Sequence, residues 1–343
     1  MLHALLDRYD TVLLDMDGVI TSEQVYWNSA ALTVWELLFS KQHFGTEDID
    51  PKELISRLKE LRSLVFLDDA VIRFLKNKGV NNNWDLSWVI VAGALFLNTR
   101  DFSAIFDWIR ILPDVKNGLY AAVTDALLFS GMAEEYAVQY GGLWKTNQLV
   151  FQEWFLGSEL FPKYWNSPSL LAGKPGLTFS EEPLVEKEPL IRLLSEIAET
   201  KRLGIGSGRP RIEAENPLRS WGVYNLFEKD AIVTYNDVMD AQEEVSKQLD
   251  GASLSKPHPF MFLRGVFGTK HTTAELLDGQ FDSVPCKKTL VIGDAGCDLF
   301  SAKSAGCDFL AVLTGIDGEN ARGYFEENGA DYILHNILDL LES

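Results

Sequence analysis

The sequence predicts an α/β protein with a doubly wound parallel sheet, interrupted by an inserted all-α segment. In the C-terminal part, short apolar runs bounded by turn residues alternate with helical patterns, as is typical of parallel sheets covered by helices. One further run of the same kind, residues 11–14, stands near the N-terminus. The residues between these two parts show helical spacing instead. We therefore expect one N-terminal strand to join the strands of the C-terminal part.

The expected elements follow from apolar periodicity and from turn residues. The strands are expected at residues 11–14, 203–206, 231–235, 289–293, 308–313 and 331–334. Helices of the C-terminal part are expected at residues 188–200, 212–221, 259–267, 299–305 and 321–328. Helices of the inserted part are expected at residues 30–39, 53–65, 86–97, 102–112, 120–129 and 148–156. Residues 158–185, rich in Pro, Gly and Ser, are expected to form an irregular return to the sheet.

These patterns divide the chain of 343 residues into two domains. Residues 1–21 and 186–343 are expected to form the α/β domain, and residues 22–185 the inserted helical domain. Eight of the nine tryptophans fall within residues 27–165. We expect their rings to form the core of the helical domain and its packing surface; an aromatic-lined substrate pocket is the alternative.

Composition and charge indicate a soluble, cytoplasmic protein. The formal net charge of −19 argues against a broad nucleic-acid surface, which requires clustered Lys and Arg. The three cysteines are too few and too irregular for a disulfide framework. The longest apolar run, residues 88–97, is about half as long as a membrane span. The N-terminal residues lack the apolar stretch of a signal peptide. No nucleic-acid or membrane partner is expected.

Two acids follow the first expected strand. In the run Leu14-Asp15-Met16-Asp17-Gly18, an apolar strand ends on Asp15 and Asp17. The carboxyl ends of parallel strands are where ligands bind in such folds. Taken alone, however, this pattern is more often an ordinary acidic turn.

A hydroxyl flanked by glycines follows the strand at residues 203–206. Backbone amides around Ser207 and Gly208, together with the serine hydroxyl, can hold a phosphate oxygen. The spacing matches neither a GxGxxG dinucleotide loop nor a GxSxG nucleophile elbow, because Arg209 occupies a position that needs glycine. Arg209 is expected either to contact a phosphate or to pair with a surface acid, and both interpretations stay open.

A lysine and a second acid pair complete the set. Lys256 precedes a proline, which favours extended backbone, and it can neutralise phosphate or carboxylate charge. Asp294 ends the strand at residues 289–293, and Asp298 follows in the first turns of a helix. Carboxylates from different strand ends suffice for Mg²⁺, which prefers oxygen ligands and keeps several waters. Cys297 lies between these acids and is expected to pack, since thiolates are poor Mg²⁺ ligands.

The four segments in this order resemble the motifs of the haloacid dehalogenase superfamily of phosphatases and phosphotransferases. They are LLDMDGV, GIGSGRP, SKPHP and VIGDAGCD. The resemblance covers residues 10–25 and roughly residues 186–340. It implies a Rossmann-like core and makes the insert a type-1 cap domain. The insert is longer than usual caps of this type, so no substrate contact can be transferred to it.

The resemblance also implies roles for single residues. Asp15 would be the nucleophile that forms an aspartyl-phosphate, and Asp17 the general acid and base. Ser207, with the backbone of Gly208, would bind the phosphoryl group, and Lys256 would steady both that group and the nucleophile. Arg209 would be a further phosphate contact.

The cofactor implied by the resemblance is Mg²⁺. Its ligands would be Asp15, the backbone carbonyl of Asp17, Asp294 and Asp298. Asp298 would bind Mg²⁺ through a water molecule or would instead orient Lys256. The implied function is a Mg²⁺-dependent phosphatase, a phosphoric monoester hydrolase acting on a small phosphorylated metabolite.

Two alternatives stay open. A phosphomutase similar to beta-phosphoglucomutase uses the same residues but returns the phosphoryl group to a sugar. A non-catalytic binding protein would have no need of all four motifs. Lys163, Tyr164 and Lys174 are candidate anion contacts of the insert and its return, but each is expected to be a surface residue, as is Arg209.

Overall fold

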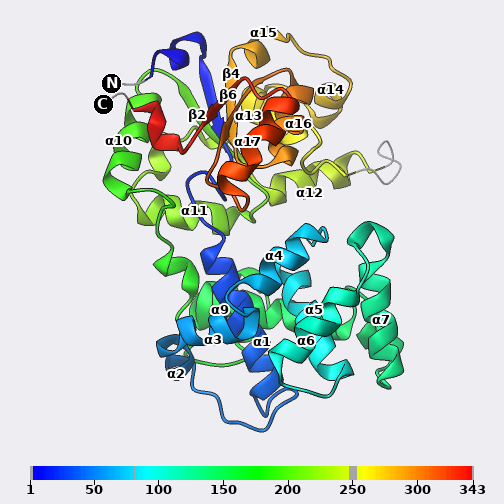
Figure 1. Cartoon of the computed structure of the whole chain (residues 1–343). Coiled ribbons are helices and arrows are strands. Elements are labelled where there is room, and N and C mark those ends of the chain that lie inside the picture. The colour runs from blue at the N-terminus through cyan, green and yellow to red at the C-terminus, as the bar shows by residue number, and fades with distance from the viewer. Residues whose placement is uncertain (1–2, 81, 247–252, 342–343) are drawn as a thin grey trace. The chain divides into compact units, whose positions relative to one another are not determined.

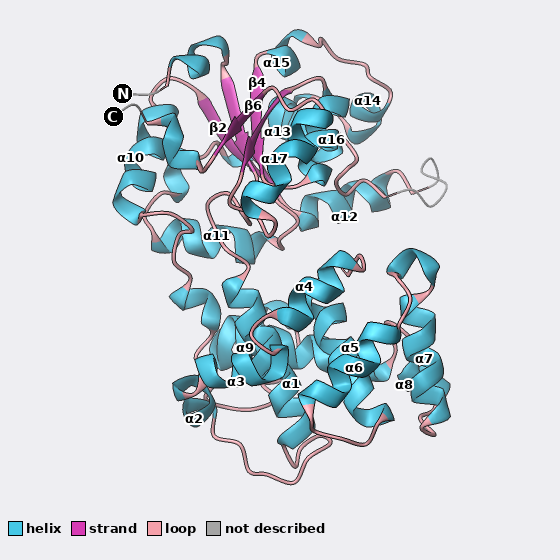
Figure 2. Cartoon of the chain, viewed as in Figure 1, coloured by secondary structure: helices cyan, strands magenta, loops and turns pink. Residues whose placement is uncertain are grey.

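The computed structural model describes residues 3–80, 82–246 and 253–341, and the chain divides into two compact units (Figure 1). Unit 1 comprises Met1–Glu23 and Glu181–Ser343, and unit 2 comprises Gln24–Ser180. The six named strands all belong to unit 1, whereas the named elements of unit 2 are helices (Figure 2). That unit 2 acts as a cap stays a prediction.

Unit 1 contains one parallel sheet with the strand order β3-β2-β1-β4-β5-β6. The strands are β1 (Thr11–Leu14), β2 (Arg202–Gly206), β3 (Ile232–Val233), β4 (Thr289–Gly293), β5 (Asp308–Val312) and β6 (Tyr332–Leu334). The order reverses between β1 and β4, because the chain runs outward from β1 to β3 and then returns to the other side of β1. Leu14 pairs with both Ile205 and Ile292, so the carboxyl ends of the three central strands are level. This order confirms the predicted doubly wound parallel sheet.

Successive residues of each strand face opposite layers of helices. Val12 and Leu14 belong to one apolar core and Leu13 to the other. The first core includes α10 (Lys187–Ala198) and α11 (Arg211–Ser220). The second includes α12 (Tyr235–Glu244), α13 (Phe260–Phe267), α14 (Thr273–Leu277), α15 (Val284–Lys287), α16 (Gly296–Ala305) and α17 (Arg322–Glu327). Because β1 and β4 are fully buried on both faces, their sequences are nearly continuous apolar runs, which made them predictable.

The one expected strand that is much shorter in the structure is β3. It ends at Val233 rather than at residue 235, because Thr234 already caps α12: its N–H and its hydroxyl both donate to Asp237 Oδ2 at 2.7 Å. The sequence did not predict α12, since only Val238 and Ala241 of this helix are buried and its apolar periodicity is weak.

Unit 2 is built around two apolar helices. Its helices are α1 (Gln24–Phe39), α2 (Pro51–Ser56), α3 (Leu58–Phe66), α4 (Ala70–Asn77), α5 (Asn83–Phe96), α6 (Phe102–Ile111), α7 (Leu119–Phe129), α8 (Glu134–Ala137) and α9 (Gly142–Trp165). Most residues of α1 and α5 are buried on all sides, as expected of central helices. Accordingly, α1 packs against α3, α5 and α9. Trp88 and Trp154 are fully buried in this unit, so these rings form core as expected.

Short 3₁₀ helices complete the two units. They are Ala4–Arg8, Val115–Asn117, Leu177–Ser180, Tyr224–Leu226, Lys229–Ala231, Gly268–Lys270, Gly318–Ala321 and Ile337–Leu340. Across the three described stretches of the chain, the structure contains no helix that is long and apolar enough to cross a membrane.

Unit 2 departs from the predicted helices in several places: α1 and α9 begin about six residues earlier than expected, and α8 was not predicted. The single helix expected at residues 53–65 is two helices, which meet at Arg57. The sequence did not indicate α4, because the turn before it has positive φ at Leu67, Asp68 and Asp69, none of which is glycine. The helix expected to end at residue 156 continues to Trp165, with one non-helical residue at Gly157. Part of the return segment is therefore helical.

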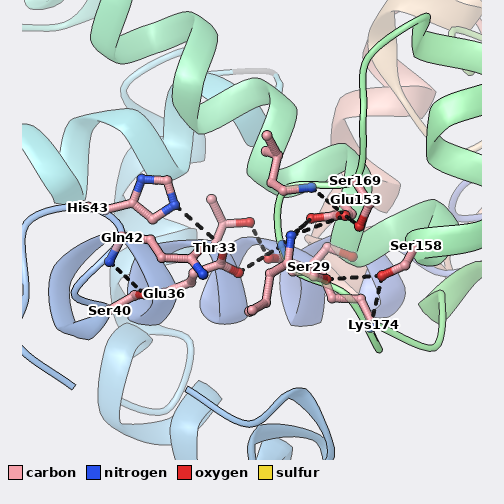
Figure 3. A network of polar contacts seen from close by, with 12 residues as sticks. Ser29, Thr33, Glu36, Ser40, Gln42, His43, Glu153, Ser158, Ser169 and Lys174 are labelled. Carbon is pink, nitrogen blue, oxygen red and sulfur yellow. Dashed lines mark hydrogen bonds and ion pairs between the residues drawn. The ribbon is translucent and has the colours of Figure 1, made fainter. Parts of the chain in front are cut away.

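Lys174 is completely buried in unit 2, between two glutamates (Figure 3). Its Nζ lies 2.8 Å from Glu36 Oε2 and 2.7 Å from Glu153 Oε2. Glu153 also accepts the backbone N–H of Leu170 at 2.8 Å. The lysine thus ties the irregular return segment to α1 and α9. The prediction of a surface lysine is wrong, because both partners are distant in sequence and leave no local pattern.

The same contacts change the ionisation of Glu36. Burial raises its pKa, but Lys174 and, more weakly, His43 lower the pKa by more, so that it lies below the ordinary glutamate value. A carboxyl group whose pKa is lowered by folding stabilises the folded state above its unfolded pKa. This contribution is lost as the pH falls through the folded pKa.

We predict that Lys174→Met lowers the free energy of unfolding by about 3–5 kcal/mol at pH 7, because it leaves two buried carboxylates without their cation. The difference from the wild type should shrink as the pH falls and the carboxylates take up protons. Urea denaturation at several pH values measures both effects. Lys163→Met, at an exposed position, is the control and should change the stability by less than about 0.5 kcal/mol. Equal effects of the two substitutions would contradict this account.

Candidate active site

Three carboxylates meet at the carboxyl edge of the sheet in unit 1. Asp15 is the first residue after β1, Asp294 is the first after β4, and Asp298 lies in the first turn of α16. One oxygen of each carboxylate lies within 4.8 Å of the oxygens of the other two. Because β1 and β4 are the strands between which the sheet order reverses, this is the position where such folds bind ligands.

Two glycines allow the neighbouring loops to approach Asp294. A Cβ atom on Gly18 would lie 2.1 Å from Asp294 Oδ2, and one on Gly315 would lie 2.3 Å from the same atom. Gly18 also has φ +77°, which disfavours any side chain. The hydroxyl of Thr314 donates to the carbonyl of Gly18 at 2.5 Å, which joins the two loops. Sequence reasoning missed Thr314 and Gly315, although a Thr-Gly pair after β5 was the available signal.

Lys256 bridges two of these carboxylates. Its Nζ lies 2.9 Å from Asp15 Oδ1 and 2.7 Å from Asp298 Oδ1, and its side chain is 8% exposed. Asp298 is fully buried, so its contact with Lys256 fixes the lysine against α16. Of the two roles expected for Asp298, the orientation of Lys256 is the one that this contact supports.

The charges of the site are unbalanced. Burial raises the pKa of Asp15 to about 7, with Lys256 opposing this rise and Asp298 and Asp17 adding to it. Burial, together with the charges of Asp298 and Asp15, also raises the pKa of Asp294 well above its ordinary value. Three carboxylates share one ammonium group, and all their donor atoms are oxygens. This donor set fits a hard divalent cation such as Mg²⁺.

The carboxylate of Asp17 binds Arg209. Arg209 Nε donates to Asp17 Oδ2 at 3.0 Å and Nη2 to Oδ1 at 2.6 Å, while the Thr21 hydroxyl donates to Oδ1 at 3.1 Å. The remaining donors of Arg209 bind Glu181, through Nη1 at 3.0 Å and Nη2 at 2.6 Å, and the carbonyl of Glu213 at 3.2 Å. All five N–H groups are thus directed at protein oxygens.

This arrangement corrects two expectations for Arg209. Its side chain is 2% exposed, so it is not a surface residue. With its N–H groups directed at Asp17, Glu181 and a backbone carbonyl, the guanidinium offers no donor to a phosphate, and the expected phosphate contact does not fit. Sequence reasoning missed Glu181, which lies in the segment expected to be irregular.

Ser207 and Gly208 lie at the same edge of the sheet. Ser207 follows β2, the neighbour of β1, and its N–H donates to the carbonyl of Val233 at 3.0 Å. Its hydroxyl oxygen accepts the N–H of Arg209 at 3.2 Å. A Cβ atom on Gly208 would meet nothing within 4 Å, so the backbone is open on that side.

We predict that Gly18→Ala destabilises unit 1 by about 1–3 kcal/mol, because the new methyl group meets the Asp294 carboxylate and φ is positive. Urea denaturation measures the loss. Gly323→Ala in α17 is the matched control, since a Cβ atom there meets nothing within 4 Å and alanine favours helix. If the two substitutions changed stability alike, the close approach of Gly18 to Asp294 would be refuted.

Comparisons with known proteins support the resemblance to the haloacid dehalogenase superfamily. A family model described as HAD-hydrolase-like matches residues 253–340, the segment that contains Lys256, Asp294 and Asp298. No curated protein matches the sequence. Among solved structures, a structural-genomics target is 27% identical with a TM-score of 0.86, over 96% of this chain and 97% of that one.

Two further solved structures show lower similarity. A phosphatase from Thermococcus thioreducens is 18% identical with a TM-score of 0.50, over 92% of this chain and 97% of that one. A haloacid dehalogenase-like family protein from Streptococcus pneumoniae is 11% identical with a TM-score of 0.44, over 97% of each chain.

The family model matches the C-terminal quarter of the chain, and the sheet around it is doubly wound. Both findings support the resemblance to haloacid dehalogenase (HAD) superfamily hydrolases that the four sequence motifs indicate.

Proposed function

We propose that this HAD-like hydrolase is a Mg²⁺-dependent phosphatase that acts on a small phosphorylated metabolite. The observation that carries the proposal is the cluster of Asp15, Asp294 and Asp298 around Lys256, where the strand order reverses. A site for phosphoryl transfer needs a nucleophile and positive charge around the transferred group. Asp15 provides the first, and Lys256 with a bound cation provides the second.

The carboxylates of Asp15 and Asp294 would hold Mg²⁺, together with the backbone carbonyl of Asp17 that the family resemblance adds, while Asp298 holds Lys256 beside them. The bound ion would offset the negative charge of the phosphoryl oxygens. Burial and, after it, the neighbouring carboxylates raise the pKa values of Asp15 and Asp294. A bound cation would favour the ionised form of both groups, which supports this assignment.

The first chemical step would be attack of Asp15 on phosphorus. Lys256 lies 2.9 Å from Asp15 Oδ1 and can hold that oxygen, so that Oδ2 is directed to the substrate. The phosphorus–oxygen bond to the leaving group breaks, and the leaving oxygen takes a proton from Asp17. The product is an aspartyl-phosphate on Asp15 and a free alcohol. The hydroxyl of Ser207 and the amide of Gly208 would hold the phosphoryl oxygens.

The second step would return the enzyme to its starting state. Asp17 removes a proton from a water molecule, which attacks the phosphorus of the aspartyl-phosphate. The bond between phosphorus and Asp15 breaks, and inorganic phosphate leaves. We further propose that unit 2, which begins shortly after Asp17 in the chain, is the cap that selects the substrate.

We predict that the protein releases phosphate from p-nitrophenyl phosphate with Mg²⁺ and that EDTA abolishes this release. Asp15→Asn should lower kcat by about 10³-fold or more, because the amide is not a nucleophile. Asp10→Asn, at an exposed position just before the amino end of β1, is the matched control and should keep its activity. Release of phosphate from this substrate and from a panel of metabolites measures the effect.

The outcomes separate the hypotheses. An Asp15→Asn variant as active as the wild type would contradict the assignment of the nucleophile. A wild type without turnover on any of these substrates would contradict the phosphatase. Conversion of a sugar phosphate to its isomer without net phosphate release would indicate the phosphomutase instead.

A further inference from the structure

Arg209 joins the proposed acid and base, Asp17, to a buried glutamate. The guanidinium makes two hydrogen bonds to Asp17 and two to Glu181, so both carboxylates are bound by the same planar group. The side chains of Arg209 and Glu181 are 2% and 0% exposed, whereas that of Asp17 is 28% exposed. Asp17 is therefore the member of this trio that a ligand can reach.

We propose that Arg209 is a positioning residue that sets the orientation of the Asp17 carboxylate for proton transfer, and that Glu181 in turn holds Arg209. The inference rests on the proposed function, because the role of Asp17 comes from it. It gives Arg209 a task other than the phosphate contact expected from its place in the GIGSGRP motif.

Stability alone does not account for this arrangement. Glu181 and Arg209 already form a buried pair of opposite charges. The cost of removing both charges from water offsets much of their attraction, so such a pair is weak evidence for stabilisation of the fold. The additional two-point contact of Arg209 reaches a third, partly exposed carboxylate. Two hydrogen bonds from a rigid fork fix both the position and the plane of a carboxylate, which a single ammonium contact does not.

The residues around Asp17 also belong to the two segments that connect the units in sequence. Thr21, which donates to Asp17 Oδ1, lies just before unit 2 begins, and Glu181 is the first residue after unit 2 ends. The two segments bind one another, because the N–H of Leu184 donates to the carbonyl of Ile20 at 2.9 Å. Both connecting segments therefore contribute to the orientation of Asp17.

The dependence of the rate on the leaving group tests this role. Departure of p-nitrophenolate needs little protonation, whereas departure of an alkoxide needs an acid. If Arg209 orients Asp17, Arg209→Met should lower kcat/KM for an alkyl phosphate by about 10²-fold more than for p-nitrophenyl phosphate, within the range of general-acid effects. Arg209→Lys keeps the charge but not the fork, and should restore only part of the difference.

A double substitution tests whether Arg209 acts through Asp17. In an Asp17→Asn background, Arg209→Met should cause no further change in the ratio of kcat/KM between the two substrates. Arg202→Met is the matched control: Arg202 pairs with Asp230 at 2.8 Å at the opposite, amino end of β2. This variant should leave the ratio as in the wild type.

The results distinguish failure of the inference from failure of the proposed function. Equal losses on both substrates in Arg209→Met, or a further change of the ratio in the Asp17→Asn background, would overturn the positioning role while the phosphatase stands. A wild type inactive on both substrates would overturn both. If Arg209→Met does not fold by circular dichroism, Arg209→Lys and Glu181→Gln decide the question, since each should change the ratio in the same direction by a smaller factor.

Discussion

The contact of Lys256 with Asp15 and Asp298 is the interaction on which the site depends. Without this ammonium group, the level ends of β1 and β4 would bring three carboxylates together with no positive charge among them. Lys256 offsets part of the negative charge of the three carboxylates. The negative charge that remains favours binding of a divalent cation. Charge balance thus connects the strand register to the proposed chemistry.

The two units use buried cations in different ways. In unit 2, Lys174 lies between Glu36 and Glu153, all three side chains are fully buried, and the result is a closed structural link. In unit 1, Lys256 pairs with Asp15, whose side chain is partly exposed and can meet a substrate. A buried lysine between two acids can therefore be a structural link or part of an active site. The exposure of the two acids decides which of these roles it has.

The sequence predicts those parts of the molecule that depend on local patterns. The strands β1 and β4 were predictable because burial on both faces makes them nearly continuous apolar runs. Asp15 and Asp294 were predicted as site residues because they directly follow these runs. Lys174 and the partners of Arg209 were not, since Glu181 lies 28 residues from Arg209 and nothing in the intervening chain indicates the contact. The turn before α4 was missed because residues other than glycine adopt positive φ there.

The central claim, that Asp15 attacks phosphorus, is tested most directly by trapping its acyl phosphate. The enzyme is quenched during turnover with Mg²⁺, reduced with borohydride, digested and analysed by peptide mass spectrometry. Borohydride converts an acyl phosphate to the alcohol, so the account predicts homoserine at position 15 and unmodified Asp17. Reduction at Asp17 or at another carboxylate, or no reduction during demonstrated turnover, would contradict it.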